Sequence, residues 1–184
     1  SLIGDIQERI RLIDSKGYEH KAKLTILKEA ARTLNYLTEN NLLQYADLEK
    51  KVEDVHSSYD RTGKELKGVE ARLREVQPLI KNISNYQRLK PVYDAFQKAK
   101  DKPGFKAKHE AELVIFEAAR STLLAMQGDE KLPSLKTLQA EQQRLLEEQQ
   151  RLYDERAKLK KEARLIDTMK ANVDIFLKPS VVQE

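Results

Sequence analysis

The sequence contains no cysteine and no tryptophan, only six glycines and five prolines, and aromatic residues make up just 6% of it. The absence of cysteine excludes disulfide bonds and thiolate metal sites. Few glycines and prolines leave few turns, which favours a small number of long helices over many strands. Nowhere does the chain approach the roughly 20 consecutive apolar residues that cross a bilayer. We therefore expect a helical, cytoplasmic protein with no membrane contact, cofactor or small-molecule substrate.

Charged residues, by contrast, are abundant. They make up 35% of the 184 residues, against 40% for hydrophobic ones, which indicates an elongated body with a thin core. The chain opens with Ser1, Leu2 and Ile3, without a starting methionine and already inside an apolar pattern. We therefore expect it to be a piece excised from a longer protein.

The middle of the chain carries an unbroken heptad seam. Apolar residues recur there at alternating spacings of three and four, which keeps one stripe on the same side of a helix and favours burial against another helix. We predict a coiled-coil arm over residues 45–83, kinked rather than broken at Pro78, which lies on the outer face. Thr62 is the only polar member of the seam, whose residues are Tyr45, Leu48, Val52, Val55, Tyr59, Thr62, Leu66, Val69, Leu73, Val76, Ile80 and Ile83.

A second long helix is predicted over residues 134–178, with Ser134 as its N-cap and Pro179 beyond its end. Its apolar residues recur every seven positions, at Leu138, Leu145, Leu152, Leu159, Ile166 and Val173. The positions four residues further on are mostly polar, namely Gln142, Gln149, Arg156, Ala163 and Lys170. A one-column seam of this kind suits a partner helix that is richer in apolar residues.

Two short helices precede the arm, in a predicted base over residues 1–44. The first carries Leu2, Ile3, Ile6, Ile10 and Ile13 and ends at a turn over residues 14–17. The second has a predicted inner face that consists of Ala22, Leu24, Leu27, Ala31, Leu34 and Leu37.

Residues 84–133 form a predicted helical head between the two long helices. Its first helix, with Tyr86, Leu89, Tyr93 and Phe96, is expected to break near Lys102-Pro103-Gly104, and a loop over residues 128–133 leads to the last helix. The economical fold is all-α, a long antiparallel helical hairpin within one chain. Pairing of either seam between two chains, as a homodimer, remains the alternative.

No catalytic or metal-binding constellation is apparent. The histidines His20, His56 and His109 lie far apart in the sequence and match no metal-binding spacing. Tyr45 and Tyr59 belong to the seam, so core packing explains them better than a nucleophilic role. The glutamates that recur every seven residues from Glu141 to Glu162 are typical of the solvated rim of a coiled coil. We assign no catalytic residue and no metal ligand.

Charge is concentrated in the head. Between Lys81 and Lys108, eight basic residues stand against two acidic ones, a local excess of +6 in a chain whose net charge is +4. Lysines and arginines beside aromatic residues such as Tyr93, Phe96 and Phe105 are typical of phosphate-backbone binding, although a lysine-rich loop can also be plain solvated surface. The candidate nucleic-acid-binding residues are Arg88, Lys90, Lys98, Lys100, Lys102, Lys106 and Lys108.

Four blocks of the sequence resemble the helical C-terminal region of relaxases, the mobilisation nucleases of conjugative plasmids and integrated elements in Gram-positive gut bacteria. They agree in order and spacing and are LTILKEAARTLNYLTEN at 24–40, YDAF at 93–96 with the helix over 105–124, LPSLKTLQAE at 132–141, and KANVD at 170–174. A relaxase nicks one DNA strand through a tyrosine, assisted by a metal on a histidine cluster, but those motifs belong to an N-terminal domain and match no position here.

The resemblance therefore implies an accessory role in conjugative transfer, without enzymatic activity in this chain. That role is DNA contact, orientation of the nuclease, or docking to relaxosome or secretion-system proteins. The alternative from another class is a structural coiled-coil module that dimerises or binds a protein without touching DNA.

Overall fold

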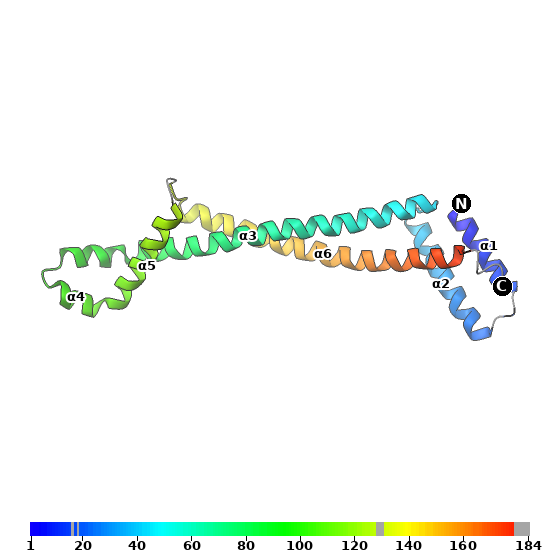
Figure 1. Ribbon diagram of the computed structural model, residues 1–184, viewed down its shortest axis with the longest axis horizontal. Coiled ribbons are helices and arrows are strands. Elements are labelled where there is room, and N and C mark those ends of the chain that lie inside the picture. Colours follow the sequence, from blue (N-terminus) through cyan, green and yellow to red (C-terminus); the bar gives the residue numbers. More distant parts are fainter. Residues whose placement is uncertain (16, 18, 128–130, 179–184) are drawn as a thin grey trace. The chain divides into compact units, whose positions relative to one another are not determined.

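The computed structural model describes residues 1–15, 17, 19–127 and 131–178, and this part of the chain is helical, without a strand (Figure 1). The predicted all-α class is confirmed. Parts of the predicted turn at 14–17 and loop at 128–133, and Pro179, lie outside the described residues. The helices are α1 (Leu2–Ser15), α2 (His20–Glu39), α3 (Tyr45–Lys98), α4 (Lys102–Lys108), α5 (Glu110–Gln127) and α6 (Leu135–Leu177).

The chain divides into two compact units. The first comprises Ser1–Lys64 and Asp154–Glu184, and the second comprises Glu65–Tyr153. The long helices α3 and α6 contribute residues to both units, and each unit therefore contains one stretch of the predicted helix pair. The predicted head, residues 84–133, falls within the second unit.

In the first unit, α1, α2, the beginning of α3 and the end of α6 share one apolar core. Its buried members are Leu2, Ile6, Tyr36, Leu37, Leu42, Leu48, Ile166, Met169 and Val173. Tyr45 Oη donates a hydrogen bond of 2.6 Å to Asp174 Oδ1, and Arg156 Nη1 donates one of 2.7 Å to the backbone oxygen of Tyr59. Because positions rise along α3 as they fall along α6, the two helices run antiparallel within this unit.

The inner face of α2 differs from the predicted one. Leu24 is 46% exposed, and Ala22 and Ala31 are also exposed, whereas Ala30 and Thr33 are fully buried beside Leu37. Thr33 is buried because its hydroxyl donates to the Glu29 carbonyl at 2.7 Å and accepts from Asn172 Nδ2 at 3.1 Å. Counting apolar residues alone misses such a position, since a threonine with both bonds satisfied packs as well as a valine would.

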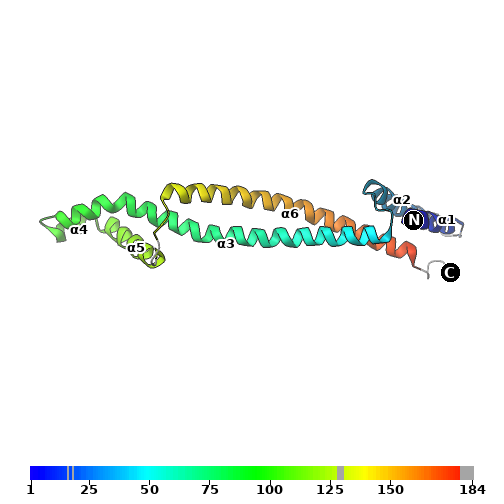
Figure 2. The same ribbon diagram turned by 90° about the horizontal axis from the view of Figure 1, so that it is seen from above.

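In the second unit, the later part of α3 packs against the beginning of α6 and against α5 (Figures 1 and 2). Val76, Ile83, Leu123 and Leu138 are the buried centre of this core. The Arg72 guanidinium binds both carboxylate oxygens of Glu141, at 2.6 and 3.1 Å, and Tyr153 Oη lies 3.4 Å from Glu70 Oε1. The order of these contacts is again antiparallel.

The seam residues lie as the heptad pattern predicts. All twelve members on α3 are buried or half-buried, and so are the six members of the α6 column. On α6 the polar positions Gln142, Gln149, Arg156 and Lys170 are half-buried, which agrees with a seam of one apolar column. Ser134 Oγ accepts the backbone N–H of Thr137 at 3.2 Å, so Ser134 is the N-cap of α6, as predicted.

The long helix does not end at Ile83. It continues through Pro78 and Pro91 to Lys98, because each proline removes a single backbone hydrogen bond and residues 84–98 contain no other helix breaker. The apolar spacing also continues, at Tyr86, Leu89, Tyr93 and Phe96, and these residues are buried or half-buried. The neighbour that covers this stretch is α5, with Tyr86 and Tyr93 both stacked on Phe116.

The break in the head lies at residues 99–101, slightly before the predicted position. Lys102-Pro103-Gly104 begins α4, with Pro103 in the first turn, where its missing N–H and fixed φ favour a helix start. Asp101 is the N-cap, since its carboxylate accepts the Gly104 N–H at 3.1 Å.

Candidate nucleic-acid interface

The seven candidate basic residues are all exposed and all belong to the second unit. Arg88, Lys90 and Lys98 lie on α3, Lys100 lies in the link to α4, and the other three are on α4. Lys102 and Lys106 are four residues apart on α4, so they share one face of that helix. The end of α3, the link and α4 thus bring together five of the seven candidates within eleven residues: Lys98, Lys100, Lys102, Lys106 and Lys108.

Two of the seven have partners within their own helix. Lys90 Nζ lies 3.4 Å from Asp94 Oδ1, and Arg88 Nη2 donates to the neutral amide oxygen of Asn85 at 3.2 Å. The five lysines between positions 98 and 108, by contrast, form no ion pair with any described residue. Asp101 is the only acidic residue in that span, and its carboxylate caps α4. No ion pair among the described residues therefore neutralises the positive charge of this lysine cluster.

The aromatic residues near the cluster have a structural role. Tyr93 stacks on Phe116 with ring centroids 4.6 Å apart, and Phe105 stacks on His109 at 4.4 Å and approaches Phe96 at 6.1 Å. These rings are half-buried or buried, and they hold α4 and α5 against the end of α3. The aromatic residues thus lie near the lysines, as the sequence indicates, and they also form the core of the small head.

A groove of about 320 Å³ lies beside the lysine cluster, between α3 and α5. Its lining includes Tyr93, Phe96 and Lys106, but also the carboxylates of Glu110 and Glu117. Two negative charges against one positive charge disfavour an anion there. Phosphate contact is thus better suited to the outer side of the α3–α4 link than to this groove.

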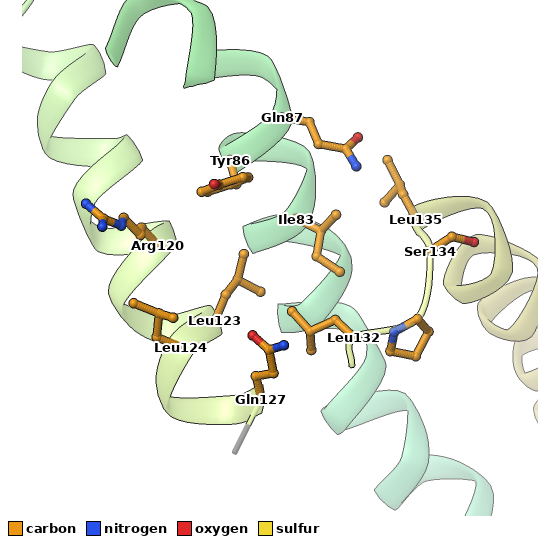
Figure 3. A pocket seen from close by; sticks show the side chains of 11 residues that line it. Ile83, Tyr86, Gln87, Arg120, Leu123, Leu124, Gln127, Leu132, Ser134 and Leu135 are labelled. Atoms are coloured by element: carbon orange, nitrogen blue, oxygen red, sulfur yellow. The ribbon is translucent and has the colours of Figure 1, made fainter. Parts of the chain in front are cut away.

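A larger hollow of about 600 Å³ lies where α3 and α5 meet the beginning of α6 (Figure 3). Leucines make up much of its lining, and Arg120 is the only charged side chain among the described residues that line it. Arg120 Nη1 donates to Tyr93 Oη at 3.2 Å and thus braces α5 against α3. The hollow contains no acid–base pair, so we assign it no catalytic chemistry.

The histidines lie apart from one another. His56 pairs with Asp167 at 2.9 Å in the first unit, His109 pairs with Glu112 at 3.2 Å in the second, and His20 is exposed at the start of α2. Across the described residues, no group of three or more histidine or acidic side chains is arranged to hold a metal ion.

Tyr45 has the most strongly bonded hydroxyl group of the described tyrosines. Asp174 accepts a hydrogen bond from the Tyr45 hydroxyl and another, of 2.9 Å, from Lys170 Nζ. Burial raises the pKa of Asp174, but the hydrogen bonds from Tyr45 and Lys170 outweigh this effect and leave it below its usual range. The same hydrogen bond to Asp174 raises the pKa of Tyr45. The hydrogen bond between Tyr45 and Asp174 therefore makes Tyr45 a structural link between α3 and α6.

The sequence-based prediction missed one feature of the charge distribution. Lys67, Arg74, Lys81 and Arg88 recur every seven residues on α3, and all four are exposed. The first three each lie one position after a seam residue, and Arg88 follows the exposed Gln87. Only Arg88 was predicted as a candidate. The heptad spacing could have revealed the set, because residues seven positions apart lie on nearly the same side of a helix.

Comparisons of this chain with protein-family models, with curated proteins and with solved structures give no match. No helix in the described part of the chain has the length and apolar character needed to span a bilayer.

Proposed function

We propose that this chain is an accessory helical domain of a relaxase-like DNA mobilisation protein, and that it contacts DNA in conjugative transfer through the lysine cluster. The observation that carries the proposal is the group of five exposed lysines between positions 98 and 108 without an ion-pair partner among the described residues. Such a group attracts phosphates and releases their counterions. The sequence resemblance supplies the parent class, in which such a domain would help to position the nuclease or dock relaxosome or secretion-system partners.

The test is a DNA-binding titration of purified protein at several salt concentrations. Replacement of Lys100, Lys102, Lys106 and Lys108 together by alanine should weaken binding to every DNA sequence. It should also flatten the fall of log affinity with log salt by up to about 3 units, since each duplex phosphate contact contributes about 0.9. Lys158, Lys160 and Lys161, exposed on α6, provide the control replacement. Equal affinity of the cluster variant and the wild type would contradict the proposal.

A second candidate function is protein binding by a structural coiled-coil module, including homodimerisation. Exposed apolar side chains on α5 favour it, because Val114 is 61% exposed, Leu124 62% and Met126 44%. If the mass measured in solution equals that of two chains, and if addition of DNA does not shift it, this candidate is supported over DNA contact.

A further inference from the structure

The basic column of α3, defined as Lys67, Arg74, Lys81 and Arg88, lies within the second unit, and its members follow one another at heptad spacing along the helix. Each step of seven residues advances about 10.5 Å along a helix, so the four side chains cover roughly 31 Å. The column lies on α3 alone, without a turn or loop between its members. The spacing of its charges is therefore fixed by the helix itself.

The charges of the column are uncompensated on their own helix. Lys67, Arg74 and Lys81 form no ion pair with any described residue, and Arg88 bonds only to neutral Asn85. Two acidic residues lie near the N-terminal half of the column, but both have partners: Glu75 binds Arg72 at 3.1 Å, and Glu70 accepts the Tyr153 hydroxyl. From Val76 to Tyr93 the sequence contains no aspartate or glutamate at all. In a chain with 35% charged residues, such a stretch is unusual, and no acidic residue within it offsets the positive charges of Lys81 and Arg88.

The surface between the basic side chains is polar and open. A hollow of about 430 Å³ separates Arg74 from Lys81 and is lined also by Gln77, Pro78 and Asn82. Amide groups at such a place can donate to phosphate oxygens, as side chains of this kind do at DNA backbones. Asn82 Nδ2 donates one of its two N–H groups to the Pro78 carbonyl at 2.8 Å, and Gln77 is exposed, so both residues have an amide donor for a ligand.

One exposed ring lies near the N-terminal half of the column: Tyr153 is 47% exposed, and its hydroxyl lies 3.4 Å from Glu70 Oε1. Tyr86, the only aromatic residue between Lys67 and Arg88, stacks on Phe116 inside the unit with centroids 5.0 Å apart. Proteins that bind single strands generally combine a basic groove with exposed rings on which bases stack. A surface with four basic side chains and a single nearby exposed ring is better suited to a double-stranded backbone, whose bases are already stacked.

We propose that the basic column binds the phosphate backbone of duplex DNA over about one helical turn, independently of base sequence. Its length of roughly 31 Å is close to the 34–36 Å repeat of the duplex, and long lysine and arginine side chains absorb the difference. This inference rests on the proposed DNA contact and gives it a second surface, on α3 rather than at the α3–α4 link. Four neutralised phosphates predict a contribution of about 3.6 to the salt slope.

The first test removes the column while preserving the helix. A variant with Lys67→Gln, Arg74→Gln, Lys81→Gln and Arg88→Gln should bind a 20-base-pair duplex at least tenfold more weakly at low salt, with a salt slope lower by about 3 to 4. The matched control changes Lys136, Lys158, Lys160 and Lys161 to glutamine, which removes the same charge from exposed positions on α6. Binding to a single strand of the same length should change far less than binding to the duplex.

The second test locates DNA directly and does not depend on a multiple variant. Because the chain has no cysteine, Gln77→Cys carries a single attachment point for a photo-crosslinker beside the column, and Gln143→Cys, exposed on α6, is its control. Crosslinking of duplex DNA from position 77 and not from position 143 is the expected result. Equal crosslinking from the two positions would overturn the assignment.

The outcomes separate the two proposals. If the column variant matches its control while the lysine-cluster variant loses affinity, the column assignment fails and the proposed DNA contact stands. If the column variant loses affinity and the cluster variant does not, the column is supported and the cluster is removed as a contact. No binding of wild-type protein to any duplex overturns both, and equal loss for single and double strands overturns the choice of duplex.

Discussion

Arg156 on α6 lies over the ring of Tyr59 on α3, with its guanidinium carbon 4.0 Å from the ring centroid. Its Nη1 also donates to the Tyr59 carbonyl at 2.7 Å and lies 3.5 Å from Thr62 Oγ1. A Cβ added at Gly63 would lie only 2.5 Å from that Nη1 atom. The glycine thus provides the space in which an arginine occupies a seam position, and Thr62, the single polar seam residue, is its neighbour.

The two glycines of α3 should respond differently to alanine. Gly68→Ala meets no atom within 4 Å, so the better helix propensity of alanine should raise the free energy of unfolding by about 1 kcal/mol. Gly63→Ala has the same gain but displaces Arg156, which loses a hydrogen bond and a cation–π contact that are each worth about 1 kcal/mol. Urea unfolding of both variants measures the difference. Equal stabilisation would show that Arg156 moves without cost.

Leucines on α6 should differ by their position relative to the seam. Leu152 is fully buried, so Leu152→Ala should lower the free energy of unfolding by about 2 to 4 kcal/mol. Leu146, on the same helix, is 40% exposed, and its replacement by alanine should cost less than about 1 kcal/mol. Chemical denaturation of the pair is the measurement, and similar losses in both would argue against the helix pairing.

The Arg72–Glu141 pair should make stability depend on acid pH. The hydrogen bond from Arg72 lowers the pKa of Glu141 below its ordinary value of 4.5. A lowered folded-state pKa stabilises the protein above the unfolded value and loses that contribution as pH falls through the folded one. A double-mutant cycle with Arg72→Gln and Glu141→Gln should therefore show coupling at pH 7 that fades as the pH falls below 4.5. A pH-independent coupling would contradict this account.

The chain by itself should neither nick DNA nor require a metal. No metal-binding cluster is found in the described residues, and the raised pKa of Tyr45 opposes its use as a nucleophile. Incubation with supercoiled plasmid and Mg²⁺ or Mn²⁺ should leave the plasmid supercoiled on a gel. Open circles that persist with protein from independent purifications, and that disappear with Tyr45→Phe, would refute the expectation.

The helices of this chain were predictable because burial of a stripe requires a strict period. Residues such as Leu48, Val76 and Ile166 occupy the core that their spacing assigns them. The errors came where the period was not the deciding factor. Thr33 is buried through two hydrogen bonds, which the apolar period does not predict. Beyond Ile83, α3 continues with α5 as its covering neighbour, and a single sequence does not reveal such a change of neighbour.

The candidate interface was predictable in part, since charge can be counted along the sequence but its surroundings cannot. The lysines from Lys98 to Lys108 are exposed, as a phosphate-binding surface requires. Phe96 and Phe105 lie near these lysines, as the sequence indicates, but their packing against each other inside the head could not be predicted. Whether an aromatic ring is available to a ligand depends on which helix covers it, and that is a tertiary property.

The seam of α3 also limits how this chain can change in length. One inserted residue turns everything beyond it by about 100° around the helix, which would carry the later seam residues out of the core and the later basic side chains off their line. Seven residues restore the phase almost completely, but the partner helix must then grow by the same amount. Substitutions at exposed positions should thus be common among natural variants of such a domain, whereas insertions and deletions within the paired stretches should occur in whole heptads and in α3 and α6 together.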